Sequence, residues 1–331
     1  MENQIKVVQF GLGSIGIAAA KLVLTKRKLR LVGGIDIDPA KVGVDLGDVL
    51  DLDHKLGTRV TNDVVKLLEA TKPDVILHST SSFLKQVEGQ LEICIKSKAS
   101  VISSCEQLFY PFQRDPKFCE RIDNLAKEHG VTVLGTGVNP GLSMDVLVLA
   151  MSSVCAEVRK IEAIRVVDAS KRRLPLQRKI GAGLKPNEFK KLVNEGKLGH
   201  IGLVESLTAV ATSLDFEIDE IQESIEPKIA VRTVETPYLK VQPEEVAGIV
   251  HTAKGLKGGE ERIKLELRMF VGSDEQYDSI NIEADPPVQL KVEGGIFGDT
   301  ATTARMVNAI PIVLKSNPGL ITAMDLPMPL C

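Results

Sequence analysis

The sequence FGLGSIG, at residues 10–16, places three glycines in the spacing G-x-G-x-x-G. The apolar, β-branched run IKVVQF leads into it and predicts a strand, and apolar residues at helical spacing follow it as far as residue 28. A second apolar strand then leads to Asp36, twenty residues after Gly16. This order of strand, turn, helix, strand and acid is typical of a dinucleotide-binding βαβ unit, although a glycine-rich turn in an ordinary α/β unit is an alternative.

Each part of this motif predicts a contact with one part of a dinucleotide. Gly11 allows a tight turn, Gly13 lets the backbone approach a pyrophosphate, and Gly16 lets helix and strand pack closely. The N–H groups at the start of the helix, at Ser14 and Ile15, are expected to face the phosphates.

Asp36 predicts which dinucleotide is preferred. Its carboxylate would accept hydrogen bonds from the adenosine ribose hydroxyls and would repel a 2′-phosphate. No arginine follows it, and Lys41 is the nearest base beyond it. We therefore expect NAD as the preferred cofactor, with NADP as the alternative.

Strands and helices continue to alternate as far as Gly141. Strands are expected at 74–78 and 100–106, and helices at 83–99 and 118–130, while 131–141 is expected to form a strand followed by a second glycine-rich loop. The alternation predicts an α/β domain over 1–141, a doubly wound parallel sheet of the Rossmann type. Ligands of such sheets bind beyond the carboxyl ends of the strands, where Ser79, Thr80 and Asn139 are the further candidate cofactor contacts.

Glu106 follows one of these strands and precedes the aromatic stretch QLFYPF. Phe109, Tyr110 and Phe112 are three of the twelve aromatic residues, nine Phe and three Tyr, in the chain. A carboxylate beside an aromatic wall could hold an ammonium group or act as a base. A glutamate at a helix N-terminus, stabilised by the macrodipole, is the alternative. His78, also at a strand end, is predicted to be a structural group with satisfied hydrogen bonds.

The pattern changes after Gly141. Helices are expected at 142–154, 187–197 and 202–216, and strands at 160–170, 228–235, 246–253, 262–271 and 278–283, with a hairpin turn at 255–260. These elements predict a second, α+β domain over 142–298 with a largely antiparallel sheet, for substrate binding and dimerisation. A long helix is expected from about 299 to 331, packed back on the first domain.

A basic segment at 171–185 lies within the second domain. It contains the bases Lys171, Arg172, Arg173, Arg178 and Lys179. Such a run is usually a solvated surface. Gly181 and Gly183 suggest the alternative of a mobile lid whose bases meet an anionic substrate.

Composition argues against several classes of function. The net charge of −3 gives no electrostatic case for a nucleic acid or an anionic membrane as partner. No apolar run reaches the roughly 18 residues of a membrane helix, and the first residues do not resemble a signal peptide. Five cysteines without C-x-x-C spacing indicate reduced thiols in a cytoplasmic protein, with no disulfides and no metal site.

Six stretches together resemble the 2,4-diaminopentanoate dehydrogenase family: SSCEQLFYP, GTGVNPGLSMD, LQRKIGAGLKPNEF, GHIGLVES, VAGIVHTAKG and GGIFGDTATTARMVNAIP. The resemblance runs from about residue 5 to the end. That family includes the native amine dehydrogenases and belongs to the dihydrodipicolinate reductase-like group. The paired-histidine motif of true dihydrodipicolinate reductases has no counterpart here, since LDHKLG at 52–57 does not reproduce it.

The resemblance implies reversible oxidative deamination of a primary amine with NAD or NADP, in which Glu106 is the main catalytic group. It implies a small amine or ketone and ammonia as partners, and a homodimer is expected. The preferred substrate is 2,4-diaminopentanoate, and simple amines or ketones without a carboxylate are the alternative. An NAD-binding sensor or structural dimer without turnover is an alternative of another class. The candidate substrate contacts are Phe109, Tyr110, Arg172, Gln177, Arg178 and His200.

Overall fold

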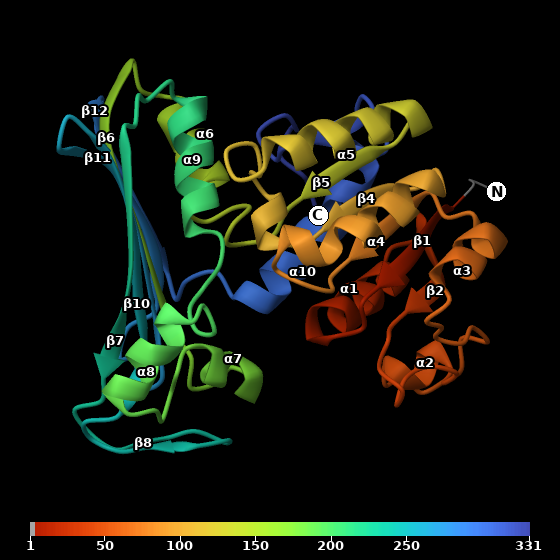
Figure 1. The fold of residues 1–331 in the computed structure, drawn as a ribbon, viewed down its shortest axis with the longest axis horizontal. Helices are drawn as coiled ribbons and strands as arrows, with labels where there is room; N and C mark the ends of the chain where they lie inside the picture. Colours follow the sequence, from red (N-terminus) through yellow and green to blue (C-terminus); the bar gives the residue numbers. More distant parts are fainter. Residues whose placement is uncertain (1–3) are drawn as a thin grey trace. The chain divides into compact units, whose positions relative to one another are not determined.

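The structure, a computed structural model, describes residues 4–331 and divides into two compact units (Figure 1). One unit comprises the chain up to Gly141 together with Phe297–Cys331, and the other comprises Leu142–Ile296. The first unit is therefore built from two segments that are distant in sequence.

A six-stranded parallel sheet forms the centre of the first unit. Its strand order is β14-β5-β4-β3-β1-β2. The strands are β1 (Ile5–Phe10), β2 (Leu29–Ile35), β3 (Val75–His78), β4 (Ser100–Ser103), β5 (Thr132–Gly135) and β14 (Gly319–Ile321). The strand order reverses at β1, which lies between β2 and β3, and this confirms the predicted doubly wound sheet.

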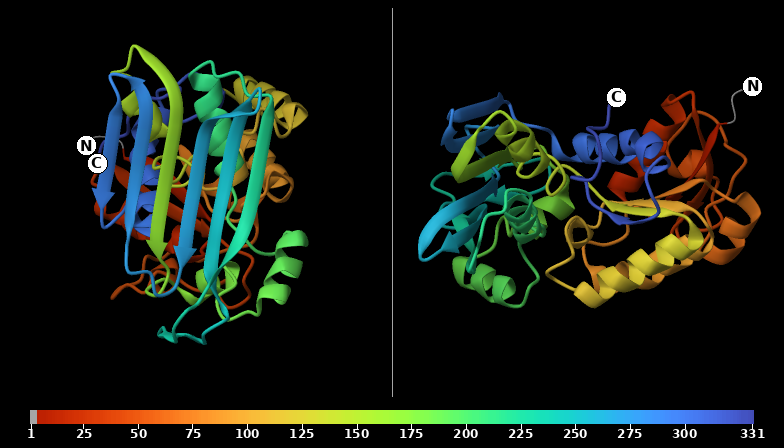
Figure 2. Two further views of the ribbon diagram at one scale, coloured as in Figure 1. Left: turned by 90° about the vertical axis from the view of Figure 1, so that its left-hand side faces the viewer. Right: turned by 90° about the horizontal axis from the view of Figure 1, so that it is seen from above.

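Helices cover both faces of this sheet (Figure 2, right). α1 (Ser14–Thr25) and α10 (Gly298–Val313) share a hydrophobic core with one face. α3 (Val64–Thr71), α4 (Leu84–Lys96) and α5 (Pro116–His129) share another core with the opposite face. Val7 of β1 belongs to the first core and Val8 to the second, as the alternation of side chains along a strand requires. The short helices α2 (Leu46–Val49) and η1 (Glu106–Leu108) lie in connections.

The second unit contains a six-stranded mixed sheet with the order β13-β12-β6-β11-β10-β7. Its strands are β6 (Glu157–Asp168), β7 (Glu220–Ile229), β10 (Val246–Lys257), β11 (Glu260–Phe270), β12 (Tyr277–Asp285) and β13 (Val288–Glu293). The pairing of β6 with β11 is parallel and the other pairings are antiparallel, so the predicted, largely antiparallel sheet is confirmed. A separate hairpin joins β8 (Val234–Glu235) to β9 (Lys240–Val241).

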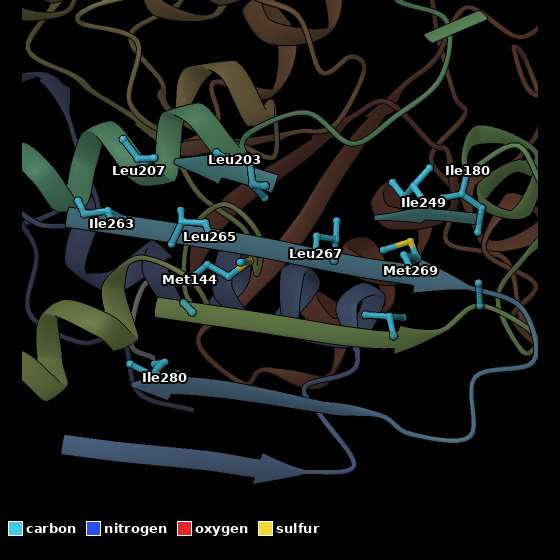
Figure 3. Close-up of a cluster of buried hydrophobic side chains, with 14 of the residues drawn as sticks. Met144, Ile180, Leu203, Leu207, Ile249, Ile263, Leu265, Leu267, Met269 and Ile280 are labelled. Atoms are coloured by element: carbon cyan, nitrogen blue, oxygen red, sulfur yellow. The ribbon is translucent and has the colours of Figure 1, made fainter. Parts of the chain in front are cut away.

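Helices pack on one face of this second sheet. They are α6 (Val146–Ser152), α8 (Pro186–Asn194) and α9 (Leu203–Ser213), while α7 (Leu174–Lys179) lies near one end (Figure 1). Figure 3 shows the core that results, with Leu203 and Leu207 of α9 gathered beside Leu265 of β11 and Met144. The opposite face carries no helix of residues 4–331 (Figure 2, left).

Two predicted helices differ from those in the structure. The helix predicted at 142–154 is confined to α6, because the side chain of Asp145 caps it by accepting a hydrogen bond from the N–H of Val146 (2.6 Å). The helix predicted from 299 to 331 is wrong beyond Val313. Pro318 and Gly319, whose φ is +140°, follow it, and the chain then adds β14 to the parallel sheet.

The strand predicted at 228–235 is also wrong. The chain leaves the sheet after Ile229, at the end of β7, and only Val234–Glu235 of the remainder is extended. β7 and β13 went unrecognised because both are edge strands whose exposed, charged side chains weaken the apolar pattern. The predicted hairpin turn lies at Gly258 and Gly259, which both have positive φ.

Candidate active site

The carboxyl ends of the parallel strands bring the predicted cofactor residues of the first unit to one edge of its sheet. The glycine loop follows β1, Asp36 follows β2 and Ser79 follows β3. Glu106 and Asn139 lie in the segments after β4 and β5. Edges of this kind are where doubly wound sheets bind their ligands.

The three glycines of the loop differ in what surrounds them. A Cβ atom on Gly11, whose φ is +88°, would lie 2.5 Å from the carbonyl oxygen of Ser79. A Cβ atom on Gly16 would lie 1.8 Å from the carbonyl oxygen of Gly11. A Cβ atom on Gly13 would have no heavy atom within 4 Å. Gly11 and Gly16 are therefore required by the fold, whereas Gly13 leaves open space in which a ligand can approach the backbone.

Helix α1 presents an uncapped N-terminus at this loop. Gly13 is its N-cap residue and provides no side-chain cap, and the first turn contains no acidic residue. The first α-helical hydrogen bond runs from the N–H of Ile17 to the carbonyl of Gly13 (2.9 Å). The N–H groups of Ser14, Ile15 and Gly16 thus have no partner within the helix, and this end of the helix suits a phosphate.

Ser79 and Gln9 hold the glycine loop in place. The Ser79 hydroxyl donates to the carbonyl of Gly11 (3.1 Å) and accepts from Nε2 of Gln9 (2.9 Å). Gln9 is fully buried, and its Oε1 has no hydrogen-bond partner among residues 4–331. The hydroxyl of Thr80 donates to Oε1 of Gln90 (2.6 Å). Gln9 was not predicted from the sequence, although a polar residue within the apolar run IKVVQF is a signal.

The carboxylate of Asp36 is fixed by three groups. Its Oδ2 accepts the N–H of Leu12 (2.7 Å) and lies 3.3 Å from Nζ of Lys41, while its Oδ1 accepts the N–H of Asp38 (2.8 Å). Burial raises the pKa of Asp36, but the two backbone hydrogen bonds and the charge of Lys41 outweigh it, so this pKa lies below its usual value. Asp36 is therefore ionised at neutral pH. The next residue, Ile37, is 84% exposed, which suits contact with an adenine ring.

Asn139 supports the same interpretation. Its Oδ1 is buried and has no hydrogen-bond partner among residues 4–331. A buried acceptor of this kind normally accepts a hydrogen bond, and the NH2 group of a nicotinamide carboxamide is a suitable donor. The open space at Gly13, the uncapped α1, the ionised Asp36 and the orphan oxygen of Asn139 together fit a bound dinucleotide.

Glu106 begins the short helix η1 and is half-buried. No hydrogen bond or ion pair to its carboxylate occurs within the described part of the chain, residues 4–331. Gly135 of β5 allows η1 to lie close to the sheet, because a Cβ atom there would lie 2.4 Å from the carbonyl carbon of Leu108. Glu106 is thus an acceptor on a closely packed support, and its carboxylate has no partner among residues 4–331.

His78 is a structural group, as predicted. It is fully buried, with Nε2 2.7 Å from Oε1 of Gln90 and Nδ1 2.9 Å from Oγ of Ser103. Burial lowers the pKa of His78 to about 4, so the imidazole is neutral at physiological pH. Because Oε1 of Gln90 is an acceptor, Nε2 carries the proton and Nδ1 accepts from the Ser103 hydroxyl.

The aromatic residues after Glu106 divide between the interior and the surface. Phe109 is 1% exposed and belongs to the interior, so its side chain is not available as the predicted substrate contact. Tyr110 is half-buried, and its ring packs edge-to-face on Phe112 with centroids 5.2 Å apart. Tyr110 and Phe112 are therefore the aromatic side chains that a ligand can reach.

The basic segment of the second unit is not an open loop, because it contains α7. Gln177 of this helix is fully buried, and its Nε2 donates to the carbonyls of Ala169 (3.0 Å), Ser170 (3.1 Å) and Arg172 (2.9 Å). Its Oε1 accepts from the hydroxyl of Thr236 (3.0 Å). Gln177, predicted as a substrate contact, thus holds the turn that carries Arg172.

The two candidate arginines have different environments. Arg172 is buried, at 5% exposure, whereas Arg178 is exposed. Ile180 and Ala182 are also buried, which anchors the segment and argues against the alternative of a mobile lid. His200 lies beside His251, with ring centroids 6.5 Å apart. His251, fully buried with its Nε2 2.9 Å from Oε1 of Glu223, was not identified from the sequence.

Residues 4–331 contain no group of three or more His, Cys, Asp or Glu side chains arranged to hold a metal ion. None of their helices has the length and apolarity needed to cross a membrane.

Comparison with known proteins identifies the family of this chain. Residues 142–331 match the family described as the 2,4-diaminopentanoate dehydrogenase C-terminal domain. The chain is 31% identical over 336 residues to 2,4-diaminopentanoate dehydrogenase of Acetoanaerobium sticklandii, covering 99% of this chain and 94% of that protein. The chain belongs to the 2,4-diaminopentanoate dehydrogenase family.

Solved structures agree with this membership. The amine dehydrogenase of Mycobacterium smegmatis superposes on this 2,4-diaminopentanoate dehydrogenase family member with a TM-score of 0.88 at 25% identity, covering 99% of this chain and 97% of the other. Dihydrodipicolinate reductase of Paenisporosarcina sp. TG-14 shares the fold alone, with a TM-score of 0.55 at 14% identity over 95% of this chain and 96% of the other. The protein is therefore an oxidoreductase of the amine dehydrogenase class.

Proposed function

We propose that this protein catalyses the reversible, NAD(P)-dependent oxidative deamination of 2,4-diaminopentanoate to 2-amino-4-oxopentanoate and ammonia. The observation that carries the proposal is the carboxylate of Glu106, which has no partner among the described residues and lies at the sheet edge that also bears the glycine loop. Family membership supports the class of reaction, and the sheet edge supports a dinucleotide as the hydride acceptor.

Glu106 acts at both proton transfers of this reaction. Its carboxylate binds the substrate ammonium group and takes a proton from it, which leaves the neutral amine. A nicotinamide held at the sheet edge would supply the hydride acceptor for the amine-bearing carbon. Glu106 releases this first proton to solvent and then accepts a proton from the water that attacks the resulting iminium carbon. It returns that proton to the nitrogen as the C–N bond breaks, and the hydroxyl group loses its own proton to form the ketone while ammonia leaves. A carboxylate suits both steps because it can pair with a cation and serve as a base.

NAD is the preferred cofactor in this proposal. The ionised carboxylate of Asp36 favours ribose hydroxyls as hydrogen-bond donors and disfavours a 2′-phosphate. Ile37, exposed directly after it, provides an apolar surface for adenine.

Arg172 is the proposed partner of the substrate carboxylate. Its buried position favours a charge-assisted hydrogen bond, which is stronger away from water. An amine dehydrogenase for simple amines and ketones would not need this group. A sensor that binds NAD without turnover would not need Glu106.

A panel of amines and amino acids, scored for NADH formation at neutral pH, tests the proposal. We expect the highest kcat/KM with 2,4-diaminopentanoate. Equal activity with an analogue that lacks the carboxylate would replace this substrate by simple amines. Failure to oxidise any amine, with NADH still bound, would favour the sensor.

A homodimer is also proposed. The helix-free face of the second sheet offers a broad surface that a second copy can cover (Figure 2, left). Light scattering on the purified protein should give twice the chain mass of 35.9 kDa. A monomer at micromolar concentration would contradict this.

A further inference from the structure

Lys41 is folded back onto Asp36 by a tight turn. Oδ1 of Asp38 accepts the N–H of Ala40 (3.0 Å), and the carbonyl of Asp38 accepts the N–H groups of Lys41 (2.9 Å) and Val42 (3.0 Å). The turn places Nζ of Lys41 3.3 Å from Oδ2 of Asp36 and 3.3 Å from Oδ2 of Asp38. A lysine five residues beyond the acid thus becomes its direct neighbour in space.

This ammonium group changes the charge that a ribose substituent meets. Asp36 alone would present a full negative charge to a 2′-phosphate, and their repulsion would exclude NADP. Lys41 lies between Asp36 and Asp38 and compensates part of the negative charge of these two carboxylates. The side chain of Lys41 also remains 26% exposed, so the ammonium group retains access to a ligand. Lysine is an established phosphate binder in proteins.

Asp36 still has acceptor capacity for a ribose hydroxyl. A carboxylate accepts about four hydrogen bonds, and the N–H groups of Leu12 and Asp38 together with Lys41 occupy three sites. The same pair of side chains can therefore serve two ligands, with Asp36 accepting from a ribose hydroxyl and Lys41 donating to a 2′-phosphate.

We propose that Lys41 sets the cofactor selectivity of this chain and allows it to bind NADP(H) in addition to NAD(H). The inference rests on the proposed function, since it concerns the same dinucleotide site. It differs from the expectation drawn from Asp36 alone, in which Lys41 has no part.

Direct binding tests this without turnover. Dissociation constants for NADH and NADPH are measured by the change in their fluorescence, with wild type, Lys41→Met, Lys41→Arg and the control Lys55→Met. Lys55 pairs with Asp48 in the same connection and does not touch Asp36. Melting temperatures establish that each variant is folded.

We expect Lys41→Met to weaken NADPH binding by roughly 10- to 100-fold, the effect of losing one charge-assisted hydrogen bond. NADH binding should change by less than about threefold, a margin well below that effect. Lys41→Arg should retain NADPH, and Lys55→Met should resemble wild type. An equal effect of Lys41→Met on both cofactors would overturn the inference.

A second variant separates the inference from the cofactor assignment. Asp36→Asn should tighten NADPH binding when Lys41 is present, and should do so less in the Lys41→Met background, because the two side chains interact. Wild type that binds NADH but excludes NADPH would overturn the role of Lys41 and leave the proposed function intact. Wild type that binds neither would overturn both.

Discussion

The hydroxyl of Ser103 donates to Nδ1 of His78 (2.9 Å) and accepts the backbone N–H of Cys105 (3.1 Å), the residue before Glu106. A buried hydrogen-bonded chain thus runs from Gln90 through His78 and Ser103 to the segment that bears the proposed catalytic group. It requires a neutral imidazole, because Nδ1 must accept a hydrogen bond from Ser103.

The neutral state of His78 predicts a stability that depends on pH. Its pKa is about 4 in the folded protein and 6.5 in the unfolded chain, so the unfolded state binds more protons below pH 6.5. The contribution of neutral His78 to the free energy of unfolding is therefore fully present above pH 6.5. It falls as the pH decreases towards 4, and the unfolding free energy is lower by about 2 kcal/mol at pH 5. Urea unfolding at pH 7.5 and pH 5 should show this loss.

The variant His78→Leu removes this titration and should show a smaller loss of unfolding free energy between the same two pH values. His54→Gln, which changes an exposed histidine, is the control and should keep the wild-type dependence. An unchanged pH dependence in His78→Leu would show that other groups cause it.

The glycine loop predicts opposite phenotypes for two similar changes. Gly13→Ala points its methyl group into open space, so it should alter the unfolding free energy by about 1 kcal/mol or less while weakening NADH binding. Gly16→Ala should destabilise the fold by more than about 3 kcal/mol, because its Cβ would overlap the carbonyl of Gly11. Unfolding curves and NADH titration measure both. Unimpaired NADH binding by Gly13→Ala would show that the cofactor phosphates do not bind beside Gly13.

Glu106→Gln keeps the size of the side chain and removes its charge and its basicity. If Glu106 is the general base, kcat should fall by roughly 10²–10⁴-fold. The dissociation constant of NADH should stay close to that of wild type, because the pyrophosphate site lies at the glycine loop. Melting temperature should also stay close, because no described residue pairs with this carboxylate. A variant with more than about a tenth of wild-type kcat, beyond even the smallest expected loss, would exclude Glu106 as the base.

Arg172 and Arg178 provide a matched pair for testing substrate recognition. Arg172→Met should reduce kcat/KM for 2,4-diaminopentanoate by about 1.5–3 kcal/mol, the worth of a charge-assisted hydrogen bond, with little effect on the decarboxylated analogue. Arg178→Met should have a smaller effect because Arg178 is exposed. Equal losses on both substrates would instead indicate damage to the turn that Gln177 supports.

The glycine spacing, Asp36 and the position of Glu106 could be predicted because each depends on local sequence order. The roles of Gln9 and Lys41 could not, since their side chains act on neighbours that only the folded turns bring close. Gln177 was assigned to the substrate, yet the helix within the basic segment turns it inward. The edge strands β7 and β13 lacked a buried face strong enough to show in the pattern.

Helix α10 has a consequence for the order in which the protein is made. Met306 and Ile310 share a core with Val7 and Leu77, strand residues from the first quarter of the chain. During synthesis α1 covers part of this face of the early strands, and the whole second unit is translated before α10 covers the rest. The parallel sheet is thus completed only after the second unit has been translated. A protein truncated after Ile296 would lose both a helix that covers this sheet and its sixth strand.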